Sequence, residues 1–174
     1  MTRAELIVFL RQHRLAVQAS VSPTGAPQAA VVGFAVSDDL EFIFDTDVSS
    51  RKIPNLRANE KIALVIGWDE ECTVQVDGVA DEPKGEELSR IQKIYFDCFP
   101  DGPSRLAWPG ITYIRVRPTW IRYSDFREGT RQIVEWRADD LRSKIAHGLR
   151  QAKQGQLLDG EAVFGDLLRP ANLL

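Results

Sequence analysis

Apolar and polar positions along the first 45 residues form short stretches that turn residues separate. Residues 2–12 carry apolar side chains at helical spacing and predict an amphipathic helix. Two apolar stretches, Leu15–Ser22 and Ala29–Val36, follow with a Pro-Thr-Gly turn between them, and Leu40–Asp45 continues after a second polar turn. Two successive hairpins of this kind indicate an antiparallel sheet.

The middle of the chain continues the strand pattern and interrupts it with a longer helix. Residues 46–60 are polar and predict a loop that enters a short helix. Strands are expected at Ile62–Trp68 and Thr73–Ala80, where Gly78 indicates a bulge or a close approach of another group. Lys84–Phe99 has apolar residues at helical spacing and predicts a helix.

A loop rich in Pro and Gly is expected at Asp101–Gly110. Alternation then resumes over Ile111–Arg117 and Trp120–Phe126, and Gln132–Trp136 indicates a short last strand. We expect six or seven antiparallel strands in all, and such a run of short strands is typical of a closed barrel. The predicted fold class is therefore α+β, an antiparallel β-barrel with flanking helices.

The strand pattern ends at Trp136. Asp139–Lys153 is charged with a narrow apolar stripe, and Glu161–Leu168 predicts a second short helix. We therefore divide the chain into a barrel domain, residues 1–136, and a helical C-terminal appendage, residues 137–174. Because an exposed apolar stripe is unfavourable, we expect the appendage to pack on the barrel, on a second copy or on another protein.

Composition narrows the class of function. Of 174 residues, 44% are hydrophobic and 27% charged, which suits a soluble globular protein. The net charge of -3 argues against a general nucleic-acid binder, and no apolar run approaches the roughly 20 residues of a membrane helix. The N-terminus has no secretory cleavage pattern, so we expect a cytoplasmic protein.

The sequence offers no obvious metal site or catalytic constellation. Cys72 and Cys98 lie far apart and are expected to be buried or half-buried thiols, and neither His13 nor His147 has a metal-ligand spacing. Rossmann, P-loop and nucleophile-elbow motifs are missing. Any redox chemistry would therefore come from a bound cofactor, and no catalytic residue is assigned.

The most informative polar segment is Thr46–Lys52. Hydroxyls, the adjacent cations Arg51 and Lys52 and the start of a helix meet where a strand ends, and a phosphate group is bound by these features together. A helix cap followed by solvated charges is the simpler alternative. The apolar strands before the segment offer a flat wall, so the combination suits flavin mononucleotide (FMN).

Other candidates are less specific. Gln75 lies among apolar strand residues and either bonds to the edge of a flavin ring or faces solvent. Three tryptophans either line a ligand pocket or pack in the core or an interface: Trp68, Trp108 and Trp120. Three arginines are expected on exposed strand faces and are most simply explained by cross-strand charge pairs: Arg115, Arg117 and Arg122.

Three pieces of the chain, in their order and spacing, resemble the pyridoxamine 5'-phosphate oxidase-related family of FMN-binding split barrels over about residues 3–136. They are Leu15–Gln28, then Phe44–Thr46 with Ser50–Lys52 and Asn55–Asn59, then Val74–Ala80. The resemblance implies a split β-barrel that forms a homodimer with two flavin sites at the subunit interface. FMN is the cofactor that it implies.

The resemblance also implies roles for single residues. The phosphate and the ribityl chain would be held by four residues: Thr46, Ser50, Arg51 and Lys52. Gln75 would approach the isoalloxazine ring, and three residues would lie against the ring through their backbone: Val32, Gly33 and Phe34. Trp120 or Tyr123 would reach the flavin from the second subunit.

The chain departs from the family pattern in two places. Nothing after Trp136 matches the substrate segment and Trp-rich tail of the true pyridoxamine-phosphate oxidases, so vitamin B6 oxidation is not expected. Pro54 falls where family members run straight into a helix, although proline is tolerated in a first helical turn. Residues 141–164 instead resemble the C-terminal half of ParD-type antitoxins, which makes a protein partner an alternative.

The predicted function is a flavin-dependent oxidoreductase that acts on an unidentified small molecule. The alternatives are a flavin carrier, sensor or stress protein without turnover, a barrel that binds a deazaflavin or heme, and an interaction module that acts through the appendage. Heme requires an axial ligand, and both histidines fall in predicted helices outside the barrel, which disfavours it.

Overall fold

The computed structural model describes residues 1–129 and 131–138, and Met1–Ala138 form one compact unit. The elements in chain order are α1 (Arg3–Gln12), β1 (Leu15–Val21), β2 (Pro27–Val36), β3 (Phe42–Asp47), α2 (Lys52–Ala58), β4 (Lys61–Ile66), a 3₁₀ turn (Asp69–Glu71), β5 (Cys72–Asp81), α3 (Gly85–Cys98), α4 (Gly102–Arg105), β6 (Ile111–Asp125) and β7 (Gln132–Arg137). Of the predicted C-terminal appendage, Arg137 belongs to β7, and residues 139–174 lie outside the described residues.

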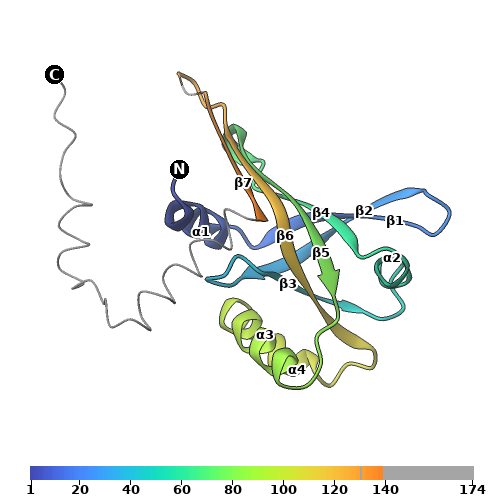
Figure 1. Ribbon diagram of the computed structural model, residues 1–174. Helices are drawn as coiled ribbons and strands as arrows, with labels where there is room; N and C mark the ends of the chain where they lie inside the picture. Colours follow the sequence, from blue (N-terminus) through green and yellow to red (C-terminus); the bar gives the residue numbers. More distant parts are fainter. Residues whose placement is uncertain (130, 139–174) are drawn as a thin grey trace, which may run out of the picture. The chain divides into compact units, whose positions relative to one another are not determined.

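All seven strands belong to one antiparallel sheet in the order β3-β2-β1-β4-β5-β6-β7. An additional pairing of β3 with β6 closes the first six strands into a barrel, and β7 extends the sheet beside β6 (Figure 1). The predicted α+β class and the predicted barrel are confirmed.

The helices cover different parts of this barrel. In Figure 1, α1 and α2 lie at opposite ends of it, and α3 and α4 lie together along one side. Thr2 begins α1 through a capping box, because its hydroxyl accepts from the Glu5 N–H while the Glu5 carboxylate accepts from the Thr2 N–H. The apolar face of α1 is buried at its end of the barrel: Leu6, Ile7 and Leu10.

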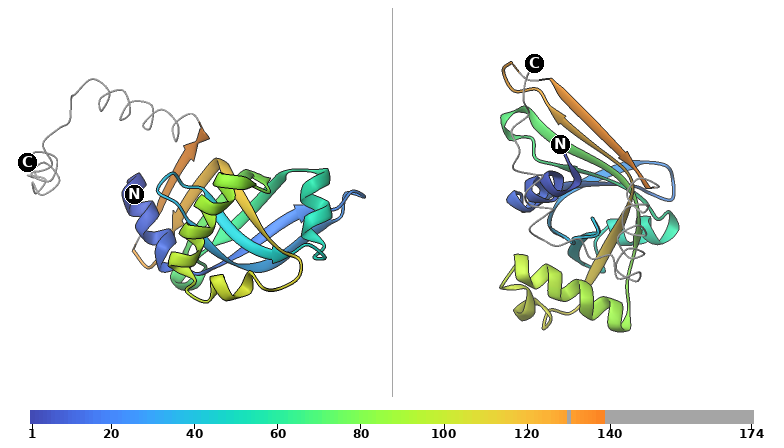
Figure 2. Two further views of the ribbon diagram at one scale, coloured as in Figure 1. Left: turned by 90° about the horizontal axis from the view of Figure 1, so that it is seen from below. Right: turned by 60° about the vertical axis from the view of Figure 1, so that its left-hand side comes forward.

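Side chains alternate between the interior of the barrel and its outer face. The interior holds large apolar residues such as Phe34, Phe42 and Phe44. On the outer face of β2 and β3, Ala35 and Ile43 pack against α3, whose Ile91 and Tyr95 complete the cluster. Figure 2 shows α3 lying across these two strands, so the helix shields one outer face from water.

The segment from α4 to the end of β6 differs in two ways from the prediction made from the sequence. The stretches Ile111–Arg117 and Trp120–Phe126 form one continuous strand. The pattern broke at Pro118, which lies opposite Gly78 where the β5–β6 register shifts between Asp77 and Gly78, so the missing N–H of proline is accommodated at a bulge. The preceding segment is also more ordered than a loop, because it contains the short helix α4.

The charged strand residues pair as the sequence indicated. Arg115 lies 2.7 Å from Asp81 and 2.6 Å from Glu87, and Arg117 lies 3.3 Å from Asp81. Arg122 approaches Glu135 of β7 at 3.8 Å. Arg117 and Arg122 therefore form pairs within the sheet, whereas Arg115, whose side chain is only 11% exposed, also ties the sheet to α3 through Glu87.

Strand β2 exchanges partners along its length. Its first seven residues, Pro27–Gly33, pair with β1, whereas its pairing with β3 is limited to Phe34–Val36. Residues Asp45–Asp47 of β3 consequently pair with β6 and not with β2. The barrel is split between these two strands, and the helix α2 follows directly from the end of β3 there.

The bulge at Gly78 provides a test of the fold. A Cβ at this position would lie 2.6 Å from Cγ1 of Val116 and 2.8 Å from the carbonyl oxygen of Arg117. We expect Gly78→Ala to lower the free energy of unfolding by about 1–3 kcal/mol, because neither neighbour is free to move. Asp77→Ala, at the exposed neighbouring residue, is the control. It is expected to change the free energy of unfolding, measured by urea denaturation, by less than about 0.5 kcal/mol. Equal stability of the two variants would contradict the bulge.

Candidate functional site

Four residues that the sequence assigned to a phosphate come together at the split. The Thr46 hydroxyl lies 3.1 Å from that of Ser50, and Lys52 Nζ donates to Thr46 Oγ1 at 3.2 Å. Arg51 precedes α2 and is exposed. Burial lowers the pKa of Lys52, because the ammonium group loses hydration that a nearby anion would replace. We call these four residues, together with the small pocket that opens beside them, the cradle.

A small pocket of about 90 Å³ opens beside the two cations. It is lined by Gln18, Ser20, Gln28, Ala29, Ala30, Arg51 and Lys52. Its volume equals that of about three water molecules at roughly 30 Å³ each, which is enough for one phosphate group. The cations and the start of β2 therefore share one concave surface.

Two buried polar residues of the cradle were not assigned from the sequence. Gln18 is 1% exposed, and its Oε1 has no hydrogen-bond partner among the described residues. Asn55 of α2 donates through Nδ2 to Ser20 Oγ at 3.2 Å and to Gln28 Oε1 at 3.0 Å. The signal was present in β1, where Gln18 and Ser20 occupy the inward positions of an otherwise apolar alternation.

An unpaired buried acceptor is unfavourable by about 1–3 kcal/mol, so Gln18 Oε1 is suited to accept a hydrogen bond from a ligand hydroxyl or a water molecule in the cradle. The helix end itself contributes less than the sequence suggested, because α2 has seven residues. Pro54 lies in the first turn of α2, which starts at Lys52, so proline does not delay the helix. The positive charge of the cradle therefore comes from side chains.

The expected ring wall lies on β2 next to the cradle. Val32 and Phe34 are buried with their side chains in the interior, and Gly33 lies between them. A Cβ on Gly33 would lie 3.1 Å from Cζ of Phe99 and 3.6 Å from the Tyr95 hydroxyl. Val32 and Gly33 belong to the part of β2 that does not pair with β3. Phe34 belongs to the paired part, and its N–H donates to the carbonyl oxygen of Arg14.

A mostly buried ionic cluster fixes the other wall of the split. Asp45, next to Thr46 in β3, accepts from the Tyr95 hydroxyl at 2.8 Å and pairs with Arg105 at 3.1 Å. The Asp45 side chain is 11% exposed and that of Arg105 16%. Burial and the neighbouring Asp45 carboxylate raise the pKa of Tyr95 well above its usual range, so its hydroxyl stays protonated as a donor.

The remaining candidates do not join the cradle within one chain. Gln75 is exposed on β5, which β1 and β4 separate from β2. Trp120 lies half-buried on β6 opposite Asp77. Tyr123 is 3% exposed and packs on Phe9, and its hydroxyl lies 3.2 Å from an Asp125 carboxylate oxygen. Tyr123 is thus buried within its own chain and is not placed to reach a second subunit.

Among residues 1–129 and 131–138, no group of three or more His, Cys, Asp or Glu residues is arranged to hold a metal ion. None of the helices in the described part of the chain is long and apolar enough to cross a membrane.

The sequence comparison identifies the family. The family model described as pyridoxamine 5'-phosphate oxidase matches residues 2–125, so the chain belongs to this family. A pyridoxine/pyridoxamine 5'-phosphate oxidase of Rubrobacter xylanophilus is 34% identical over 93 residues, which are 53% of this chain and 41% of that protein. The chain therefore spans about two fifths of the length of the curated relatives that it matches.

Solved structures share the fold at low sequence identity. A heme-binding protein from Mycobacterium smegmatis has a TM-score of 0.69 at 15% identity, covering 82% of this chain and 61% of that one. HutZ, a heme storage protein from Vibrio cholerae, has a TM-score of 0.60 at 17% identity, covering 68% and 91%. At these identities the likeness concerns the fold alone.

The contribution of the Asp45–Arg105 ion pair to the stability of the protein can be measured. Arg105→Met leaves a buried carboxylate without its cation, and we expect a loss of about 3–5 kcal/mol in the free energy of unfolding. Adding Asp45→Asn to Arg105→Met should recover part of this loss, which a double-mutant cycle measures by urea denaturation. Arg117→Met, at a more exposed ion pair, should cost less than about 1 kcal/mol. Additive effects of the two changes would contradict the pairing.

Proposed function

We propose that the chain binds FMN at the cradle and acts as a flavin-dependent oxidoreductase on a small molecule. The observation that carries the proposal is one pocket lined by Arg51, Lys52 and Gln18, in which two cations lie close to a buried acceptor without a donor. A phosphate monoester attached to a polyhydroxyl chain supplies both missing partners. Membership in the pyridoxamine 5'-phosphate oxidase family supports the same ligand.

The residues of the cradle fit the parts of FMN. Arg51 can donate two parallel N–H groups to phosphate oxygens, and Lys52 adds a point charge whose desolvation the anion offsets. Gln18 Oε1 would accept from a ribityl hydroxyl, while Thr46 and Ser50 add hydroxyl donors. Val32 and Gly33 would contact the ring through the part of β2 that does not pair with β3. Bound FMN supplies the electron transfer, and the chain's residues bind and orient it.

A homodimer is part of the proposal. The outer face of β2, β1 and β4 carries a row of Val31, Val17 and Val65, and a second row consists of Ala29, Ala19 and Ala63. Val31, at the β2 end of the valine row, is 60% exposed. Such a face favours burial against a second copy.

The outer rows continue onto residues that the family resemblance assigned to the flavin. Gln75 follows Val65, and Trp120 follows Ala63 and Asp77. We therefore keep Gln75 and Trp120 as interface residues of the proposed dimer. Tyr123 is not kept, because its ring and hydroxyl are engaged within its own chain.

The alternatives differ in how they relate to the same observations. A non-catalytic flavin carrier or sensor would use the same cradle, and reduction by a nicotinamide donor distinguishes it from an enzyme. For heme, His13 is the histidine of the described residues that could serve as an axial ligand, but it lies at the end of α1 and does not line the cradle. His147 lies outside the described residues. Cytoplasmic location stays a prediction from the sequence.

The cradle is tested by removing its charge. Replacing both cations by alanine, Arg51→Ala with Lys52→Ala, removes charge-assisted hydrogen bonds worth about 1.5–3 kcal/mol each. FMN affinity, measured by quenching of flavin fluorescence, should fall by about two to four powers of ten. Lys84→Ala with Lys93→Ala removes the same charge elsewhere and should leave the affinity unchanged. Unchanged FMN affinity in the folded cradle variant would refute the assignment.

The dimer is tested by placing a charge on the apolar outer face. Light scattering of the wild-type chain should give about 39 kDa, which is twice the 19.6 kDa of one chain. Val31→Asp should shift the mass toward the monomer and weaken FMN binding. Val8→Asp is the control, because Val8 is 57% exposed on α1 and lies outside this face. A wild-type monomer at micromolar concentration would contradict the shared site.

A further inference from the structure

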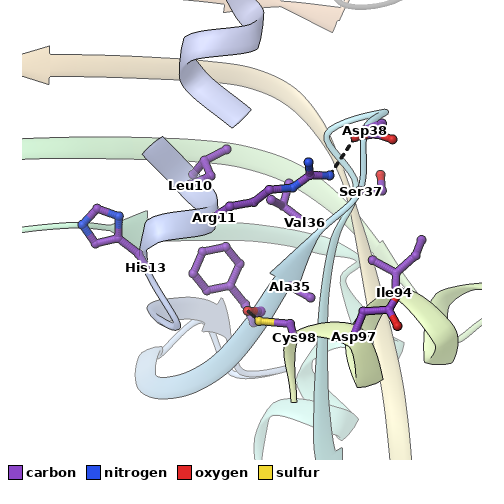
Figure 3. Close-up of a pocket in the computed structure, with 11 residues that line it drawn as sticks. Leu10, Arg11, His13, Ala35, Val36, Ser37, Asp38, Ile94, Asp97 and Cys98 are labelled. Atoms are coloured by element: carbon purple, nitrogen blue, oxygen red, sulfur yellow. Dashed lines mark hydrogen bonds and ion pairs between the residues drawn. The ribbon is translucent and has the colours of Figure 1, made fainter. Parts of the chain in front are cut away.

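The outer face of the sheet is covered by a helix at one end of β2 and open at the other. At the covered end α3 packs on Ala35, and Ile94 and Cys98 of this helix border a cleft of about 470 Å³ (Figure 3). Towards the start of the strand the outward-facing residues Pro27, Ala29 and Val31 are exposed. The open part of the outer face therefore consists of the first half of β2 together with β1, β4 and β5.

Charge on this open face is confined to two side chains. Among the outward-facing positions of β1, of β4, of β5 up to Val79 and of the open part of β2, the charged residues are Lys61 and Asp77. Both are exposed. Neither side chain forms a hydrogen bond or an ion pair with another residue of 1–129 and 131–138. One positive and one negative charge thus stand without partners on an otherwise uncharged surface.

The charges that border this face are already engaged. Arg117 of β6 lies 3.3 Å from Asp81, and Arg122 lies 3.8 Å from Glu135. Arg137 of β7 also has a partner. Lys61 and Asp77 are therefore the charges that a second surface has to match.

Lys61 and Asp77 lie at diagonal positions on neighbouring strands. Asp77 is directly opposite Ala63, which is two residues from Lys61. Diagonal neighbours are about 7–8 Å apart, and here they do not pair within the chain. Both residues line a hollow of about 450 Å³ on the outer face, which small residues of three strands make shallow and smooth: Ala19, Ala63 and Gly78. The hollow therefore has opposite charges on its border and room for another surface.

Two-fold symmetry satisfies both charges at once. In a symmetric pair of copies, each contact occurs twice, so that if Lys61 meets the partner's Asp77, then Asp77 meets the partner's Lys61. A register that does not bring them together leaves both charges without partners on a face that loses its water, which is unfavourable. The charge pattern of this face is thus complementary to itself.

We infer that the open outer face binds a second copy of the chain in the register that pairs Lys61 of each copy with the partner's Asp77. The two-fold axis then runs between these residues, past Ala63 and Ala19 and towards Val31. The alanines beside the axis let the two sheets approach closely. This inference rests on the proposed homodimer and adds the register in which the copies meet.

The same register brings a residue of the partner to the cradle. Gln75 is the next outward-facing residue of β5 beyond Asp77, and the axis carries it to the end of β1 at Val21 of the other copy. This follows from strand spacings of about 4.8 Å and residue rises of about 3.3 Å. Ser20, next to Val21, lines both the hollow and the pocket of the cradle. Each cradle is therefore completed from the side of Ser20 by the partner's Gln75.

Reversal of single charges tests the register. Charge reversal turns attraction into repulsion, whereas removing one charge of an exposed pair changes little. The dimer dissociation constant of the full chain is measured by sedimentation velocity without FMN. Lys61→Asp and Asp77→Lys should each raise it about 10- to 100-fold, because like charges then face each other twice. Lys93→Asp, the same change at an exposed residue of α3, is the control and should leave it within about threefold of wild type.

Mixing the two single variants shows whether the charges meet between copies. A heterodimer of a Lys61→Asp chain and an Asp77→Lys chain contains two pairs of opposite charge, although each variant alone contains only repulsive pairs. We expect the mixture to dimerise within about threefold of the wild type. The double variant, Lys61→Asp with Asp77→Lys in one chain, should do the same. Far-UV circular dichroism should be unchanged in all of them, since both side chains are exposed within the chain.

The outcomes separate the register from the proposed function. Single variants that dimerise as tightly as the wild type, or a mixture that stays as weak as its components, would overturn the register. A wild-type dimer that binds FMN would then leave the proposed function standing. A wild-type monomer would overturn the register together with the proposed homodimer.

Discussion

The exchange of partners along β2 is the constraint on which the candidate site depends. Seven residues of this strand pair with β1 and the next three pair with β3, so the edge between β2 and β3 stays open where β3 turns into α2. Buried polar contacts hold both sides of this opening. Asn55 fixes α2 to Ser20 and Gln28 on one side, and Asp45 is bound to Tyr95 and Arg105 on the other. Because such groups are unfavourable when unpaired, they determine the position of each wall.

Gln18 marks the place where the split is suited to bind a ligand. Its Oε1 lies buried without a donor among the described residues, beside Arg51 and Lys52. The shared fold does not decide this preference, since solved structures with 15–17% identity retain the barrel and differ in sequence.

The sequence predicted the parts of the molecule that follow local rules. Alternation located the strands, and the order of three short pieces identified the family that the family model matches. The pattern failed at Pro118, where a cross-strand bulge accommodates a residue that interrupts alternation, and at α4, which four residues form within a Pro- and Gly-rich segment. For the cradle, Thr46, Ser50, Arg51 and Lys52 could be found because they are close in sequence. Gln18 left a signal as a polar residue at an inward position of β1, but its burial without a partner is visible only in the structure. Arg105 could not be found, because its role arises from a partner that lies far away along the chain.

The central claim is that the split between β2 and β3 holds a flavin. Its most direct test is the absorption spectrum of the purified full-length chain, recorded before and during titration with FMN and, separately, with hemin. The account predicts oxidised-flavin bands that change on binding and saturate at one FMN per chain, with no stoichiometric shift of the hemin Soret band. A hemin complex of defined stoichiometry, together with FMN spectra that equal those of free FMN, would contradict it.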